Sequence, residues 1–458
     1  MFKYAMNRFL VAAWVCMGCA TSGGAADAVI AEKTVRAHMD FLAGDALHGR
    51  GSGTRDEWIA ATYLGSQLRA VGVEPLGDDG GFVQSIDIER TQVVGMPRLM
   101  AGARQYDHGA QMLVLELGAA QVSGSLHKFH PGAAVPPASA LLMPAAADPR
   151  NADGLNAAAL VLWRESPAQR DLWDSLKSRK LSVGRTRLTG LSGDAASPPS
   201  AAHIVLSAAA YGAIAALPEN SPCSLAAETE AVSSRTWNAV GRITGSDPAL
   251  REQLILLSAH LDHLGESGDG PDRIYNGADD DASGTIAVLT LAEAIAGGAR
   301  PKRSIVFAFF GSEEVGSFGA RYFLGKPTVP VDFIIANLEF EMIGRSDSTV
   351  ADHTLWLTGW DRTNLGPMLA SHGARLVADP HPKENFFMRS DNITLARRGV
   401  VAQTVSSYGL HEQYHQPTDD IAHIDFQHMT ESIQSMLAPI QWLAGSTFKP
   451  EWRPGGRP

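Results

Sequence analysis

The second half of the chain alternates apolar runs with helical patterns, and this alternation limits its fold more than any other feature. From about residue 236 the runs "LILLSAH", "SIVFAFFG", "VDFIIANLEFEMIG" and "VVAQTVSS" are largely apolar. Between them, "SGTIAVLTLAEAIAGG" predicts a helix with Ser283 as N-cap and Gly297 or Gly298 as stop, and "GSFGARYFL" begins another. Strands without polar alternation are buried on both faces. We therefore predict an α/β fold with a mainly parallel central sheet and helices on both faces.

The first half of the chain has a different composition and residue pattern. Residues 34–72 predict two helices around the glycine-rich "HGRGSGTRD", and "FVQSIDIE" predicts a strand by its alternation. From about residue 91 to 235 the chain is rich in Ala, Gly, Ser and Pro. Its strand candidates there are short: "QMLVLEL", "AALVLW" and "AHIVLS". We interpret this segment as a smaller, β-rich inserted domain.

The N-terminus has the pattern of a targeting segment. Lys3 and Arg8 precede the apolar "FLVAAWVCMGCA", and the small residues "TSGGAADA" follow. This run is too short for a membrane span and predicts a signal peptide cleaved after Ala26 or Ala28. Lipidation of Cys19 and a buried N-terminal helix are the alternatives. No later run approaches about 20 apolar residues, so we expect an exported protein, periplasmic or secreted, without a transmembrane segment after signal removal.

These patterns divide the chain into five parts. The predicted division is a signal peptide over 1–28, the first part of the main domain over 29–90, the insertion over 91–235, the larger part of the main domain over 236–448, and a tail over 449–458. A net charge of -11 without a basic cluster argues against nucleic acid as a partner. Cys16 is expected to leave with the signal, so neither a disulfide framework nor a thiolate metal site is expected.

Residues able to bind metals stand where the apolar runs end. In open α/β sheets, functional groups gather at the carboxyl ends of strands. His260 and Asp262 lie on one side of an extended chain, so His260 could bind a metal while Asp262 supports it. The adjacent Glu313 and Glu314 point in different directions and can have different roles. A surface histidine and an acidic first turn of a helix are the ordinary alternatives.

Three further groups strengthen the pattern. Glu339 and Glu341 lie in an apolar run, where carboxylates are rare unless they are paired or bind a metal. The loop "LHEQYHQPTDD" adds His411 and His415. The row 279–281 in "YNGADDDASG" is three aspartates, which repel one another unless a cation or water holds them. Together, these nitrogen and oxygen donors favour Zn²⁺ or a neighbouring divalent ion, with one aspartate bridging two ions.

The order of these motifs resembles a known family. "AHLD", "GADDDASG", "FGSEEVG", "EMIGR" and "YHQPTDD", over residues 236–425, resemble the di-zinc aminopeptidases, a family that includes bacterial leucine aminopeptidases, glutamate carboxypeptidase II and glutaminyl cyclases. The N-terminal "LAGDALHGRGSGT" resembles the opening of bacterial members. The insertion resembles a protease-associated domain through "AALVLWRES" and "AAHIVLSAAAYGAIAAL". The resemblance implies a zinc exopeptidase fold of the phosphorylase/hydrolase-like type and two zinc ions per chain.

The resemblance also implies roles for single residues. His260 and Glu341 would bind one zinc, Glu314 and His415 the other, Asp280 would bridge them through a cis Asp280–Asp281 peptide, Glu313 would be the general base, Asp262 would orient His260, and Tyr414 would polarise the substrate carbonyl. Many relatives have Asp where this chain has Glu341. Glu339 lies two residues away on the same face of the predicted strand, and it is therefore the rival ligand.

The implied activity is hydrolysis of N-terminal residues from peptides that have a free N-terminus. Three alternatives remain. The first is a carboxypeptidase or other hydrolase of the same fold, for which Arg345 and Arg389 are candidate carboxylate anchors. The second is a glutaminyl cyclase with one zinc ion. The third is a catalytically inactive binding protein.

Overall fold

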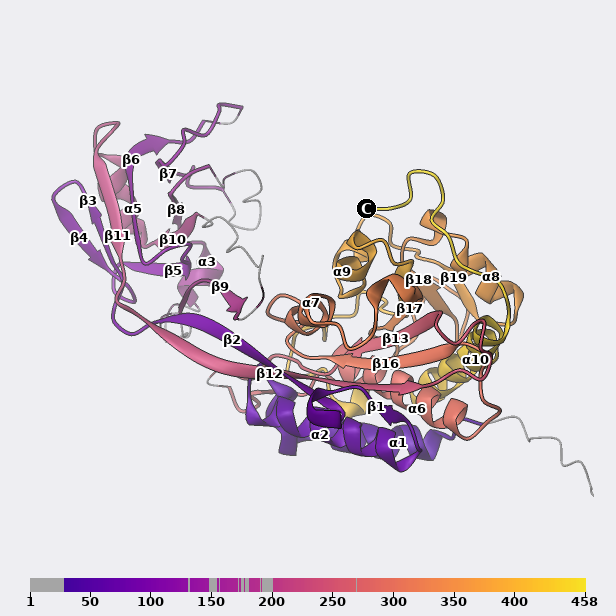
Figure 1. The fold of residues 1–458 in the computed structure, drawn as a ribbon. Coiled ribbons are helices and arrows are strands. Elements are labelled where there is room, and N and C mark those ends of the chain that lie inside the picture. The colour runs from indigo at the N-terminus through magenta and orange to yellow at the C-terminus, as the bar shows by residue number, and fades with distance from the viewer. Residues whose placement is uncertain are drawn as a thin grey trace, which may run out of the picture.

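The computed structural model describes most of the chain as two bodies joined by a pair of long strands (Figure 1). The described residues are 29–458, apart from 131, 148–154, 156, 172, 174–176, 178–180, 190, 192–200 and 269. The predicted signal peptide, residues 1–28, lies outside them. Within the described residues, we find no helix with the length and apolarity needed to cross a bilayer.

The main body is built on one large mixed sheet. Among the described residues its ten strands follow the order β19-β18-β20-β17-β13-β16-β12-β2-β9, with β1 paired to β12. The four predicted apolar runs form β16, β13, β17 and β20, which are neighbours paired in parallel. Antiparallel pairing is added by β12, β2 and β9 on one side and by β18 on the other. The α/β prediction is confirmed, and parallel pairing is concentrated in the central strands.

The bounds of the strands in this sheet follow. They are β1 Glu74–Pro75, β2 Val83–Val93, β9 Ser182–Leu188, β12 Thr229–Ile243, β13 Leu254–His260, β16 Ser304–Phe310, β17 Ile334–Phe340, β18 Leu355–Leu357, β19 Leu376–Ala378 and β20 Ala402–Ser406.

Helices cover both faces of the sheet, as predicted. Alternate residues of β13 point to opposite faces: Ile255 and Leu257 join the core under α1, α2, α6, α8 and α10, whereas Leu254 and Leu256 join the core under α7 and α9. The helix bounds are α1 Glu32–Leu42, α2 Arg55–Ala70, α6 Gly284–Ala296, α7 Phe318–Gly325, α8 Leu365–Ser371, α9 Asn392–Arg397 and α10 Phe426–Gly445. The sheet is therefore buried on both sides, and polar functional groups are expected to gather at the carboxyl ends of its strands.

The start of α6 differs from the prediction. Ser283 does precede the helix, but its side chain makes no capping hydrogen bond. Its hydroxyl instead donates to the carbonyl of Asp279 at 2.8 Å and accepts the N–H of Ile343 at 2.8 Å. Asp281 accepts the N–H of Gly284 at 3.0 Å and so takes the capping role. Gly297 ends the helix, as predicted.

The second body is a separate β-rich unit. Its described strands form an eight-stranded sheet in the order β4-β3-β11-β6-β7-β8-β10-β5, with its own apolar cores. The bounds are β3 Arg98–Ala101, β4 Arg104–Asp107, β5 Met112–Glu116, β6 Gln121–Lys128, β7 Ala140–Leu142, β8 Leu160–Arg164, α3 Pro167–Asp171, β10 Ala202–Leu206, α5 Ala208–Ala215 and β11 Pro222–Ala226. Cys223 is buried here, without a disulfide partner among the described residues.

A two-stranded ribbon connects the bodies. β2 and β12 pair antiparallel without interruption from Val93–Thr229 to Val83–Ala239. At one end the ribbon meets the inserted sheet, and at the other β12 pairs with β16 in the main sheet (Figure 1). β9 returns from the insertion to pair with β2. A small hairpin of β14 Gly265–Glu266 and β15 Ile274–Tyr275 follows β13.

Candidate metal centre

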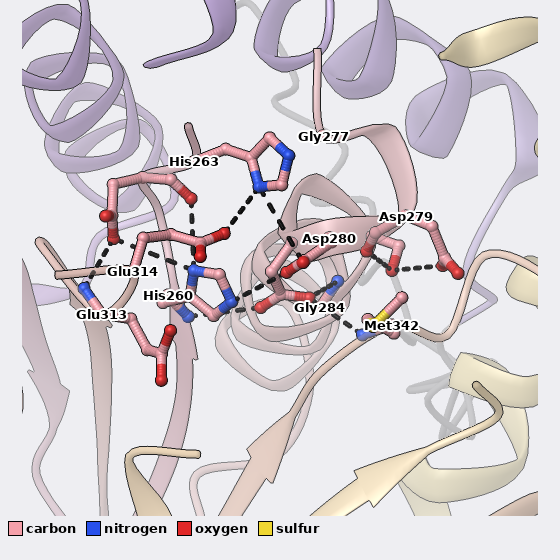
Figure 2. Close-up of polar contacts among 12 residues, drawn as sticks. His260, His263, Gly277, Asp279, Asp280, Gly284, Glu313, Glu314 and Met342 are labelled. Atoms are coloured by element: carbon pink, nitrogen blue, oxygen red, sulfur yellow. Dashed lines mark hydrogen bonds and ion pairs between the residues drawn. The ribbon is translucent and has the colours of Figure 1, made fainter. Parts of the chain in front are cut away.

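Four segments deliver acidic and histidine side chains to one edge of the main sheet. His260 is the last residue of β13, and Glu341 directly follows β17. Glu313 and Glu314 follow β16 in the turn before α7. Asp280 comes from the irregular turn Ala278–Ser283 that leads into α6. Because β13, β16 and β17 are parallel neighbours, their carboxyl ends bring the residues that follow them together. Figure 2 shows His260, Asp280, Glu313 and Glu314 side by side.

One cluster consists of His260, Asp280 and Glu341. Each offers a ligand atom, and these atoms lie within 4.8 Å of one another. Nε2 of His260 is 3.1 Å from Oδ1 of Asp280. That nitrogen is buried and has no hydrogen-bond partner among the described residues. A histidine nitrogen and a carboxylate oxygen that lie this close without a hydrogen bond have the arrangement expected of two ligands that share one ion.

A second cluster surrounds the other oxygen of Asp280. Nε2 of His415 lies 3.2 Å from Oδ2 of Asp280 and 3.3 Å from Oε2 of Glu314. His263 also belongs here: with Asp280 and Glu314 it offers ligand-type atoms within 4.8 Å of one another. Its Nδ1 lies 2.7 Å from Oε1 of Glu314 and 3.9 Å from Oδ2 of Asp280 (Figure 2). Asp280 thus presents Oδ1 to one cluster and Oδ2 to the other, which is the geometry of a bridging carboxylate.

The donor set and its spacing fit zinc. Zn–N and Zn–O bonds of about 2.0–2.2 Å place neighbouring ligand atoms of one ion about 2.9–3.5 Å apart. The contacts from His260 to Asp280 and from His415 to Asp280 and Glu314 all fall in that range. Imidazole and carboxylate are ligands that Zn²⁺ accepts. The residues present therefore suit a divalent ion in each cluster.

The charged groups of the two clusters shift one another's pKa values. Burial would raise the pKa of Asp280, but His260 and His415 hold it well below its usual range. Burial alone would lower the pKa of His415, but Asp280 and Glu314 raise it to about 10. Burial raises the pKa of Glu313 well above its usual range, against the attraction of His260. In the metal-free protein, protons on the histidines balance part of the carboxylate charge.

The outer two aspartates of the row are structural ties. Oδ1 of Asp279 accepts the N–H of Gly344 at 2.7 Å, and Oδ2 is 2.9 Å from Nε2 of His411. Oδ1 of Asp281 accepts the N–H of Met342 at 3.1 Å, and Oδ2 accepts the N–H of His260 at 3.2 Å. The predicted cis peptide bond between Asp280 and Asp281 is present. The outer two aspartates therefore hold the chain at the ends of β13 and β17, and Asp280 between them is the member of the row that faces both clusters.

Asp262 contacts both His260 and the Glu313 turn. Nδ1 of His260 is 3.2 Å from the main-chain carbonyl of Asp262 and 3.8 Å from its carboxylate. The same carboxylate accepts the N–H of Glu313 at 2.9 Å and the hydroxyl of Ser52. His260 is thus oriented mainly by the carbonyl, whereas the carboxylate holds the turn that carries the two glutamates.

Glu339 and Glu341 have separate surroundings. Oε2 of Glu339 accepts the N–H of Asn392 at 2.6 Å and the hydroxyl of Thr404 at 3.2 Å. Burial raises its pKa well above the usual range. In the described structure, Glu341 joins a metal-binding cluster and Glu339 joins none. Of the two rival ligands, the geometry favours Glu341.

A cavity opens beside the two clusters. Tyr414 lines it and stacks on His415 with ring centroids 3.9 Å apart. Burial raises the pKa of Tyr414, so its phenol keeps its proton. The lining also includes an aromatic pair, Trp356 and Phe386, which stack with centroids 5.5 Å apart. The cavity lining is Asp280, Glu313, Glu314, Glu341, Met342, Trp356, Thr358, Phe386, Arg389, Ser390, Thr404, Ser406, Tyr408, Tyr414 and His415.

Several residues that support the site were missed by sequence reasoning. Arg50 is buried and donates to the carbonyls of Leu42 and Asn276 at 2.6 Å each, and of Gly277 at 2.9 Å. It therefore anchors the segment that leads into the aspartate row. Glu57 accepts the N–H of Ser312 at 3.0 Å and so supports the Glu313 turn from the N-terminal side.

His263 was also missed, and for both His263 and Arg50 a signal was present in the sequence. Arg50 lies inside the glycine-rich "HGRGSGT", and His263 follows "HLD" directly. A single arginine or histidine in such a position has many ordinary explanations, so only the fold assigns them to the site.

The fold and the two clusters define an α/β scaffold with a candidate two-metal centre at its strand ends. Residues 238–439 match the model of Peptidase family M28, so the chain contains a domain of this family. Curated relatives include the vacuolar membrane protease of Clavispora lusitaniae, 37% identical over 102 residues, which are 22% of this chain and 9% of that protein. Leupeptin-inactivating enzyme 1 of Streptomyces exfoliatus is 29% identical over 110 residues, 24% of this chain and 23% of that protein. The matches thus span less than a quarter of either relative.

Solved structures share the fold over nearly the whole chain. An aminopeptidase from Aneurinibacillus sp. strain AM-1 has a TM-score of 0.56 at 15% identity and covers 94% of this chain and 96% of its own. The zinc aminopeptidase BSAP from Bacillus subtilis has a TM-score of 0.58 at 15% identity and covers 92% and 97%. At this identity the likeness establishes the common fold, including the inserted body.

Proposed function

We propose that the protein is an exported aminopeptidase that uses two zinc ions to remove N-terminal residues from peptides. The observation that carries the proposal is Asp280, whose two carboxylate oxygens face two separate ligand clusters. His260 and Glu341 would hold one ion, and Glu314 and His415 the other. The M28 domain and the zinc aminopeptidase that shares the fold support this assignment.

Glu313 is the proposed general base. Two zinc ions at this site would lower the pKa of a water molecule and polarise the scissile carbonyl. Glu313 lines the cavity beside both clusters without belonging to either. Its carboxylate would accept the proton of the attacking water and deliver it to the leaving amine. The raised pKa of Glu313 suits such a proton carrier. Tyr414, whose phenol keeps its proton, would donate a hydrogen bond to the substrate carbonyl.

The test is a substrate panel run with and without a chelator. An aminopeptidase hydrolyses aminoacyl anilides and free peptides, but it leaves N-acetylated peptides intact. Chelation should abolish the activity, and added zinc should restore it. Release of ammonia from peptides with N-terminal glutamine would instead indicate a cyclase. A protein that binds zinc but turns over none of these substrates would be a binding protein, and the proposal would fail.

A carboxypeptidase is the second candidate, favoured by Arg389. Arg389 lines the cavity and lies over the ring of Phe386, 5.0 Å from its centroid. Its guanidinium forms no hydrogen bond or ion pair within the described part of the chain, so it is available for a substrate carboxylate. Arg345, the other candidate anchor, donates to Gln413 at 2.8 Å. Cleavage of N-blocked peptides that is lost in Arg389→Gln would establish this alternative.

Export and domain roles belong to the same proposal. Lys3, Arg8 and the short apolar run after them support a signal peptide that is cleaved within residues 16–28. We assign the sheet between Arg98 and Ala226 to a protease-associated-like insertion. Mass spectrometry of the N-terminus from native cells tests the export. An intact Met1 would refute it, and a lipidated Cys19 would place the protein on a membrane surface.

A further inference from the structure

His263, Asp280 and Glu314 offer ligand-type atoms that lie within 4.8 Å of one another, yet the contacts of His263 with the two carboxylates are unequal. We propose that His263 is a positioning residue, which holds Glu314 in the orientation that the second zinc ion requires. The inference rests on the two-metal centre proposed above. It adds a residue to that centre and assigns the two histidines beside Glu314 to different roles.

The contact distances separate the two histidines. Nε2 of His415 is 3.2 and 3.3 Å from the Asp280 and Glu314 oxygens, which is the spacing of ligands on one ion. Nδ1 of His263 is only 2.7 Å from Oε1 of Glu314 and makes a hydrogen bond to it. It is 3.9 Å from Oδ2 of Asp280, beyond the range of about 2.9–3.5 Å for neighbouring ligands of one zinc. His263 therefore bonds to a ligand rather than sharing an ion with it.

The hydrogen bond divides the two oxygens of Glu314 between two partners. Oε1 accepts the N–H of His263, so Oε2 is the oxygen that faces His415. A hydrogen bond to the second oxygen fixes the torsion of a ligating carboxylate. Partners of this kind typically change metal affinity about 10–100-fold when they are removed. His263 is thus built to select one binding mode of Glu314.

The chain forms a fitted space for this imidazole. Gly277 packs against the ring, and a Cβ at that position would come within 2.5 Å of Cγ of His263, so a larger residue is excluded. The N–H of His263 donates to the carbonyl of Arg50 at 3.2 Å, which ties its backbone to the N-terminal glycine-rich segment. The ring also meets His415 edge-on, with centroids 5.6 Å apart. Only 1% of His263 is exposed, so water cannot readily replace its N–H.

Three substitutions test the role, because they place an N–H differently. In His263→Asn, the amide nitrogen occupies roughly the place of Nδ1 and can still donate to Glu314. In His263→Gln, the amide lies near the place of Nε2, which forms no hydrogen bond among the described residues. His263→Leu removes the donor altogether. The readouts are the zinc stoichiometry, the dissociation constants of both ions by chelator competition, and the absorption spectrum of the Co²⁺-loaded protein. The second ion is the one that Glu314 and His415 would hold.

We expect His263→Asn to bind the second ion within about threefold of wild type. His263→Gln and His263→Leu should bind it about 10–100-fold more weakly, with the first ion unchanged. Equal losses in all three variants would show that His263 is itself a ligand and overturn the proposal. So would unchanged affinity in all three. If His263→Leu does not fold, the Asn and Gln pair decides. A wild-type protein that binds one ion at saturating zinc would refute the two-metal centre itself, which is a separate outcome.

Discussion

The carboxylate of Asp419 holds the main chain of Asp280 in place. Its Oδ2 accepts the N–H of Asp280 at 3.0 Å, and its Oδ1 accepts the N–H of Asp279 at 3.0 Å. The bridging aspartate is therefore fixed by a second carboxylate from the loop that also supplies His415. Both oxygens of Asp419 are used, so an amide at this position cannot reproduce the contact.

Replacing Asp419 should weaken the metal centre as a whole. In Asp419→Asn, one of the two N–H groups would face the donor side of the amide and lose its acceptor. We expect zinc affinity to fall about 10–100-fold, the range seen for residues that support metal ligands. Asp420→Asn is the matched control, since Asp420 is a partly exposed neighbour that caps a short helical turn. Chelator competition measures both variants, and equal affinities in the two would contradict the role of Asp419.

Asp280→Asn should affect both ions, because Asp280 serves both clusters. An amide lacks the charge and has only one oxygen, so it cannot bridge as a carboxylate does. We expect metal analysis to find a loss of tightly bound zinc at both sites and turnover to disappear. Asp272→Asn, at an exposed position on the preceding loop, should retain both ions. Loss of only one ion in Asp280→Asn would count against the bridge.

Substitutions of Glu313 and Glu314 should have different effects on turnover and on zinc binding. Glu313→Gln keeps the size of the side chain but cannot accept a proton, so zinc should stay bound while turnover falls roughly 10²–10⁴-fold. Glu314→Gln removes a charged ligand, so its zinc affinity should fall and excess zinc should partly restore activity. Zinc content and turnover are measured side by side. A zinc-depleted Glu313→Gln with a zinc-replete Glu314→Gln would reverse the two assignments.

The metal-free protein should be more stable at mildly acidic pH than at alkaline pH. Burial raises the pKa of Asp391 and of Asp419 to about 7 in the folded protein, against about 3.9 in an unfolded chain. The folded state therefore binds more protons between about pH 4 and 7, and its stability falls as the pH rises. His415 acts in the same direction, since its pKa is raised to about 10 and its stabilising charge is lost towards that pH.

Thermal unfolding of chelator-treated protein at pH 5.5 and pH 8 measures this effect. We expect the midpoint to be a few degrees higher at pH 5.5. Zinc should reduce or reverse the difference, because its ligands bind the ion in their deprotonated forms. If chelator-treated protein instead has the higher unfolding midpoint at pH 8, the titration of Asp391, Asp419 and His415 does not dominate the pH dependence of its stability.

The parts of the site predicted from sequence are those that local patterns encode. A strand buried on both faces is a run of apolar residues, so β13, β16, β17 and β20 were predicted together with the polar residues at their ends. Strand β12 was missed, because its first half lies in the ribbon, where its residues are mostly polar and none is fully buried before Thr236. Helix α10 was missed as well, and Pro439 within it interrupts the pattern that predicts a helix.

The supporting residues could not be predicted, because their partners are distant in the chain. Arg50 bonds to Asn276, 226 positions away, and Asp419 bonds to Asp280, 139 positions away. Nothing local marks either contact. The side-chain direction of His263 is equally unpredictable, since it lies beyond the last residue of β13, where strand alternation no longer applies.

The ribbon of β2 and β12 sets how the inserted body can be repositioned. Because the ribbon is a continuous ladder that runs into the main sheet, the insertion is connected through hydrogen-bonded strands rather than through an unpaired linker. A strand repeats its side-chain direction every two residues, so the ribbon can change length only in even steps without turning the insertion over. Removing two residues from each strand would draw the insertion closer by about 6.6 Å with the same face presented. Removing one residue from each would reverse that face. The spacing between the two bodies is therefore a discrete variable, which engineering can adjust one pleat at a time.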